Sequence, residues 1–148
     1  MTDDHSADRL ALEQLKYRYL RTLDTKDWDG FEACFVPEAT GDYAGLAFAD
    51  RDALVGYMRN NLGPGVVTMH HVHHPEIVID GDAATATWYL HDQVIVPELK
   101  FRLEGAAFYE DRCVRTPDGW RIAHTGYRRT FELSYSLDQL EGHRLTTG

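Results

Sequence analysis

The sequence predicts an α+β fold in which three amino-terminal helices pack on a strongly curved antiparallel sheet and enclose a pocket. Up to residue 62, apolar side chains recur at helical spacing, and from residue 66 onward apolar and polar residues alternate as they do in strands. Short turns such as Asp80-Gly81-Asp82 join the strand-like stretches, which is typical of antiparallel hairpins. Helices that close one side of a bent sheet leave a conical interior, and such an interior suits a small apolar ligand.

The individual elements follow from the same patterns. Helical spacing predicts helices over residues 7–24, 28–35 and 54–62. Tyr19 points toward the core from the first helix, and the second helix stops before Pro37. Alternation predicts strands over residues 66–72, 75–80, 83–96, 100–115 and 120–132. We expect one domain over residues 1–148, in which residues 135–148 form a tail or a lid.

Composition excludes several classes of partner. The chain has 24 acidic and 15 basic residues and a net charge of −9, which repels nucleic acid phosphates and anionic membrane surfaces. Cys34 and Cys113 match no metal or redox spacing, so we expect both thiols to be buried and reduced. The first residues carry no basic and apolar leader, and no stretch has the roughly 20 apolar residues of a membrane span. These observations predict a cytoplasmic protein.

Four histidines, His70, His71, His73 and His74, lie within five positions in the middle of the chain. Successive side chains of a strand point to opposite faces, so Thr68 and His70 face one side while His71 and His73 face the other. A pocket can therefore receive only one or two of these imidazoles. His71 and His73 have the spacing of a pair of metal ligands, but two ligands do not make a site and nothing nearby requires a third. We expect no metal.

Two aspartates lie where folding alone does not favour a charge. Asp92 shares its predicted strand face with apolar residues, and a buried carboxylate needs a partner. Asp24 lies near the carboxyl end of the first helix, where the helix dipole disfavours a negative charge. Structural explanations exist for both, because Asp92 can form an ion pair or lie in a bulge and Asp24 can lie in a solvated turn. Arg129 shares its predicted face with Tyr127 and Phe131, and it is either the countercharge of one of these acids or a residue of the rim.

A family resemblance is carried first by residues 19–29, Tyr-Leu-Arg-Thr-Leu-Asp-Thr-Lys-Asp-Trp-Asp, which resemble the SnoaL-like branch of the NTF2-like superfamily. Further stretches are similar to bacterial bile acid 7α-dehydratases, namely Met69-His70, Pro75-Glu76-Ile77, Trp88-Tyr89-Leu90, Gly105-Ala106-Ala107-Phe108-Tyr109 and Thr125-Gly126-Tyr127-Arg128-Arg129. Scytalone dehydratases are a more distant likeness. The resemblance covers about residues 12–132 and implies the NTF2-like cone, whereas residues 44–50 and 93–104 depart from the pattern.

The resemblance implies an active site of Tyr19, Asp24, His70, Asp92 and Arg129. It implies a lyase that needs no cofactor and that eliminates water from a hydroxyl beta or vinylogous to a carbonyl. We expect His70 to act as base and then acid, with Asp24 or Asp92 holding its tautomer. The expected substrate is a small apolar hydroxy-ketone, steroid-like or otherwise polycyclic, free or as a coenzyme A thioester. Its expected contacts are Tyr43, His73, Trp88, Tyr109 and Tyr127.

Other functions of this fold stay open from the sequence. NTF2-like domains also serve as non-catalytic binding or oligomeric assembly modules, and other relatives are ketosteroid isomerases or polyketide cyclases. Three polar groups converging inside the cone would argue against an assembly module. Related proteins often associate through the outer face of the sheet, so the resemblance also implies a homo-oligomer.

Overall fold

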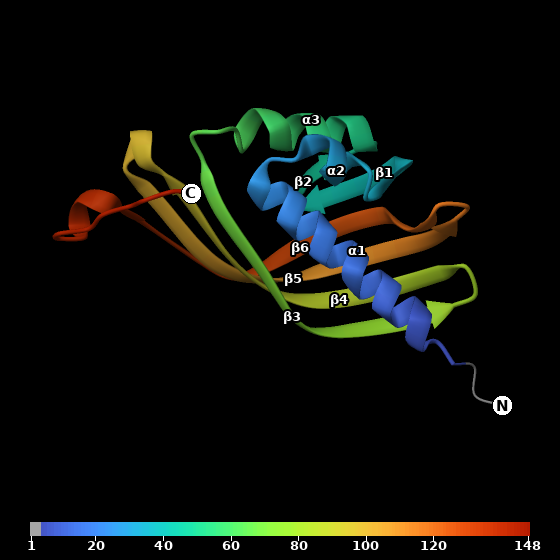
Figure 1. Cartoon of the computed structure of the whole chain (residues 1–148). Coiled ribbons are helices and arrows are strands. Elements are labelled where there is room, and N and C mark those ends of the chain that lie inside the picture. The colour runs from blue at the N-terminus through green and yellow to red at the C-terminus, as the bar shows by residue number, and fades with distance from the viewer. Residues whose placement is uncertain (1–3) are drawn as a thin grey trace.

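The computed structural model describes residues 4–148 and shows a strongly curved, unclosed sheet with helices on one side of it (Figure 1). The helices are α1 (Ser6–Thr25), α2 (Trp28–Glu32) and α3 (Arg51–Asn61). The strands are β1 (Phe35–Tyr43), β2 (Leu46–Phe48), β3 (Val67–Asp80), β4 (Ala83–Val96), β5 (Phe101–Thr116) and β6 (Gly119–Ser136). They form one six-stranded sheet in the order β2-β1-β6-β5-β4-β3. The α+β class, the three helices and the curved sheet are confirmed.

The region after α2 differs from the prediction. The second helix ends at Glu32, and the chain then forms β1, which pairs in parallel with β6, so the sheet is not wholly antiparallel. Pro37 is compatible with a strand here because the register of β1 against β6 is interrupted between Phe35 and Thr40. A missing N–H group therefore breaks no regular ladder.

The histidine-rich region forms one strand instead of two. The pairing of β3 with β4 is interrupted between His73 and Glu76, and His74 has a φ of 49°, as expected at a bulge. Pro75 is tolerated because β3 is the edge of the sheet. The carboxyl-terminal segment is also more ordered than the sequence suggested, since β6 continues to Ser136 and Leu137 is buried.

Packing of α1 against the sheet builds the core. Its buried face carries Leu12, Leu15, Tyr19 and Leu23 at helical spacing, as predicted. Cys34 and Cys113 are both buried and free of disulfides, which confirms their expected role. None of the helices within residues 4–148 combines the length and apolar character that a bilayer crossing requires.

One charged pair lies inside this core. Lys16 Nζ of α1 is 2.9 Å from Asp111 Oδ2 of β5, and both side chains are 2% exposed. Thr125 donates a hydrogen bond of 2.7 Å to the other oxygen of Asp111. The ammonium group also lies over the rings of Tyr19 and Tyr109, at 4.2 and 3.4 Å from their centroids. The pair thus supports two tyrosines from behind.

Replacing only one member of this pair is expected to be costly. Lys16→Met should lower the free energy of unfolding by about 3–5 kcal/mol, because Asp111 would stay buried without its countercharge. The double variant Lys16→Met/Asp111→Asn should recover most of that loss, since the amide oxygen can still accept from Thr125. Urea denaturation of the three proteins tests this, and equal losses in the single and double variants would contradict it.

Candidate active site

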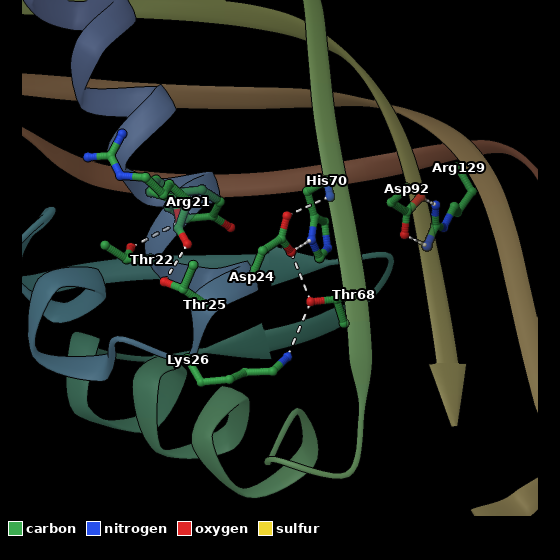
Figure 2. A network of polar contacts seen from close by, with 10 residues as sticks. Arg21, Thr22, Asp24, Thr25, Lys26, Thr68, His70, Asp92 and Arg129 are labelled. Atoms are coloured by element: carbon green, nitrogen blue, oxygen red, sulfur yellow. Dashed lines mark hydrogen bonds and ion pairs between the residues drawn. The ribbon is translucent and has the colours of Figure 1, made fainter. Parts of the chain in front are cut away.

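The end of α1 is tied to the edge strand β3 by one carboxylate (Figure 2). His70 Nδ1 is 2.7 Å from Asp24 Oδ1, and the backbone N–H of His70 donates to Asp24 Oδ2 at 2.8 Å. An ionised Asp24 makes Nδ1 the protonated ring nitrogen, which leaves Nε2 as the basic one. Asp24 is therefore no solvated turn residue, and it is Asp24, not Asp92, whose carboxylate is hydrogen-bonded to the imidazole of His70.

His71 and His73 lie on the face of the sheet opposite to His70, as strand alternation predicted. His71 lies beside His91 of β4 and His73 of the same strand, with ring centroids 6.4 and 6.3 Å away. His91 is bonded instead to Glu104, at 2.9 Å. Within residues 4–148, no three histidine, cysteine or acidic side chains are placed to hold a metal ion together.

Asp92 forms a bidentate ion pair with Arg129 across the sheet (Figure 2). Arg129 Nη2 donates to Asp92 Oδ2 at 2.9 Å, and Nη1 donates to Oδ1. Asp92 is 3% exposed. Burial works against the charge of Arg129, but the hydrogen bond and the charge of Asp92 outweigh it and raise the pKa of Arg129. Arg129 therefore stays charged beside Asp92, which is the ion-pair alternative for Asp92.

This ion pair must pass over the intervening strand β5, and Gly105 leaves the space. Gly105 pairs with Asp92, and a Cβ atom there would lie 2.7 Å from Arg129 Nη1 and 2.9 Å from the carbonyl oxygen of Phe131. Sequence reasoning gave Gly105 no role. The available signal was a glycine inside a predicted strand, which often marks a close approach.

A bulge separates Arg129 from a residue predicted to share its face. The register of β5 against β6 shifts so that Ala107 pairs with Arg129 while Ala106 pairs with Phe131. Neighbouring alanines point to opposite faces, so Phe131 turns outward and is 55% exposed. The predicted face of β6 was wrong at Phe131.

A cavity of about 180 Å³ lies between the helices and the concave face of the sheet. Seven of the predicted site residues line it: Tyr19, Tyr43, His70, Asp92, Tyr109, Tyr127 and Arg129. Tyr57 and Asn61 of α3 line the cavity and are also exposed, so they form its rim. Neither residue was predicted to belong to the site, because apolar periodicity identifies the buried face of a helix and not its exposed positions.

Five tyrosines line the cavity, and the hydroxyl groups of four of them stay protonated because of burial. Burial raises the pKa of Tyr19, Tyr43, Tyr109 and Tyr127 above the ordinary value. The hydroxyl oxygens of Tyr19 and Tyr43 are 2.5 Å apart. The cavity therefore presents neutral hydrogen-bond donors near the imidazole.

Three predicted residues lie elsewhere. Trp88 is 2% exposed and packs edge-to-face against Tyr17 in the core. His73 lines a separate groove of about 480 Å³ between α1 and β3, which His70 and Asp24 also border. Asp24 reaches the cavity only through His70. The structure brings together the other seven predicted site residues.

Comparison with known proteins gives the family. A SnoaL-like domain matches residues 4–126. An uncharacterized protein of Mycobacterium tuberculosis strain H37Rv is 29% identical over 129 residues, which cover 85% of this chain and 88% of that protein. The chain belongs to the SnoaL-like family. This membership confirms the resemblance to the SnoaL-like branch of the NTF2-like superfamily.

Solved structures support the same fold for this SnoaL-like chain. A "Putative Scytalone Dehydratase" from Novosphingobium aromaticivorans has a TM-score of 0.83 at 21% identity, over 91% of this chain and 92% of that chain. Hexachlorocyclohexane dehydrochlorinase LinA-type3 from Novosphingobium barchaimii has a TM-score of 0.81 at 14% identity, over 98% of both chains. At these identities the similarity establishes the shared fold alone.

The arrangement in this SnoaL-like domain has defined chemical capacities. Nε2 of His70 can accept a proton, and the carboxylate of Asp24 can stabilise the resulting imidazolium. The tyrosine hydroxyls can donate to an oxygen that gains negative charge. The ion pair of Asp92 and Arg129 supplies a fixed polar wall without a free charge. A proton can thus be removed beside a carbonyl inside this cavity.

The space at Gly105 can be tested by filling it. Gly105→Ala should lower the free energy of unfolding by about 1–3 kcal/mol, because the added methyl group overlaps Arg129 and the Phe131 carbonyl. Gly56→Ala in α3 is the matched control, since its Cβ would meet nothing within 4 Å and alanine favours a helix. Chemical denaturation measures both, and an unchanged stability of Gly105→Ala would contradict the packing described.

Proposed function

We propose that this SnoaL-like protein is a lyase that eliminates water from a hydroxyl group beta or vinylogous to a carbonyl, without a cofactor. The observation that carries the proposal is the Asp24–His70 pair, which lies at the wall of a cavity lined by four neutral phenols. A non-catalytic assembly module has no need for such a base, because buried polar groups are costly unless they serve a function.

The reaction assigns one step to each group. Nε2 of His70 removes the proton from the carbon next to the carbonyl, and the electrons of that bond move to give an enolate. The enolate oxygen accepts a hydrogen bond from Tyr19 or a neighbouring phenol. The enolate then collapses to the conjugated carbonyl, the carbon–oxygen bond breaks, and the leaving hydroxide takes the proton back from His70. Water and an unsaturated ketone result.

Names of the structural neighbours are consistent with this class of reaction. A dehydratase removes water from its substrate and a dehydrochlorinase removes HCl, and both names occur among proteins with this fold. Both eliminations begin by removing a proton from carbon. The shared step requires only a base and a suitable pocket. The Asp24–His70 pair is the candidate base, and the cavity beside it is the candidate pocket.

Cavity size bears on the substrate. Pockets that enclose drug-sized ligands hold roughly 300–1,000 Å³, whereas this cavity holds about 180 Å³. The volume favours a hydroxy-ketone of one or two rings over a four-ring steroid. A steroid, free or as a coenzyme A thioester, would need the rim at Tyr57 to open.

The base is tested by two adjacent histidines. His70→Ala should lower turnover by about 10²–10⁴-fold while substrate affinity changes little, as is usual for a general acid–base group. His71→Ala is the matched control, because His71 lies on the opposite face of the same strand. Absorbance of the conjugated product measures turnover. Equal activities in the two variants would refute the assignment of His70.

Substrate size is tested with a panel. A bicyclic β-hydroxy-ketone should be dehydrated faster than a 7α-hydroxy-3-oxo-4-ene steroid or its coenzyme A thioester. Tyr57→Ala should raise turnover of the steroid, because it removes a side chain of the rim, whereas Tyr17→Ala in the neighbouring groove should not. Fast turnover of the steroid by the unaltered protein would contradict the size argument and favour a mobile rim.

A further inference from the structure

Lys26 ends α1 in a conformation that a lysine does not favour. Its φ of 61° and ψ of 28° are left-handed. Its N–H group donates to the carbonyl of Leu23 at 3.3 Å, and the N–H group of Asp27 donates to that of Thr22 at 2.9 Å. Glycine is the usual residue at such a helix end, because it has no Cβ atom to strain. The backbone gives no reason for a lysine here, which points to a role for its side chain.

The side chain of Lys26 begins a chain of hydrogen bonds that runs into the active site (Figure 2). Lys26 Nζ donates to Thr68 Oγ1 at 3.2 Å, and Thr68 Oγ1 donates to Asp24 Oδ1 at 2.8 Å. An ammonium group can only donate and a threonine hydroxyl has a single proton. The direction is therefore fixed, and the hydroxyl proton must point at Asp24.

Asp24 Oδ1 thus accepts from two side chains at once. Thr68 approaches it from one position of β3, and Nδ1 of His70 approaches from two positions further along the same face. Because the carboxylate is held at both oxygens, it cannot rotate away from the imidazole without breaking a bond to β3. Thr68 precedes His70 by two residues, so strand alternation alone places both side chains on one face.

We propose that Lys26 and Thr68 are positioning residues, which hold the Asp24 carboxylate so that His70 keeps its proton on Nδ1 and presents Nε2 to the cavity. Neither residue lines the cavity or has a catalytic role of its own. The effect on turnover rests on the proposed function, whereas the effect on the imidazole tautomer does not. A simple tether between α1 and β3 would explain stability but not the tautomer.

The test compares isosteric variants of Thr68. Thr68→Val keeps the shape and removes the hydroxyl, and Thr68→Ser keeps the hydroxyl. We expect the Nδ1–H signal of His70, assigned in NMR spectra by its loss in His70→Gln, to shift and broaden in Thr68→Val and to recover in Thr68→Ser. Turnover should fall roughly 10-fold in Thr68→Val, as is usual when a hydrogen-bonding support of a site is removed, with KM within about twofold.

Lys26→Gly separates positioning from stability. Glycine relieves the left-handed backbone, so the folded protein should be at least as stable to heat, yet the Nδ1–H signal should broaden because the ammonium group is gone. An unchanged His70 signal in both Thr68→Val and Lys26→Gly would overturn the proposal. A changed signal in a protein whose unaltered form dehydrates nothing on the panel would uphold the positioning and overturn the proposed function.

Discussion

The bonds from the Asp24 carboxylate to β3 are the constraint on which the site depends. An edge strand has a neighbour on only one side, so the sheet itself restrains β3 along one edge only. Asp24 supplies a further restraint at Thr68 and His70, from the end of a helix whose buried face packs in the core. The unfavourable position of a carboxylate at a helix end is offset because its partners come from the strand. The side chain of Asp24 therefore fixes both the position of the α1 end against β3 and the orientation of the His70 imidazole.

Buried pairs fix the other polar groups of the cavity. Arg129 is held by Asp92, and the rings of Tyr19 and Tyr109 rest against Lys16. A buried polar group that has its partners specifies one geometry, because every alternative leaves a donor or a charge unsatisfied in a low dielectric. The hydrogen bonds of Asp24 and the buried pairs of Arg129 and Lys16 share no residue. Each network is therefore expected to tolerate changes in the other.

The sequence predicts those features that depend on local periodicity. Alternation predicted that His70 and His71 lie on opposite faces, and helical spacing predicted that Tyr19 points inward. Both patterns depend only on the geometry of a single strand or helix. Features that depend on distant segments were not predictable: the parallel strand β1, the bulge before Phe131, and the passage over Gly105 all arise from pairing between residues far apart. The choice between Asp24 and Asp92 as partner of His70 was of the same kind, because it is set by how α1 lies against β3.

Product identity is expected to depend on the rim and not on the base. Removing a proton beside a carbonyl is common to dehydration, to loss of a halide and to isomerisation, so the Asp24–His70 pair alone does not choose among them. The choice follows from which substituent lies where the enolate can expel it, and that is governed by substrate orientation. In the proposed reaction we expect orientation to depend on Tyr57 and Asn61 of α3 and on Val94, the cavity residue that falls in the stretch departing from the dehydratase pattern. Relatives that share the buried networks can therefore differ in reaction through these few positions.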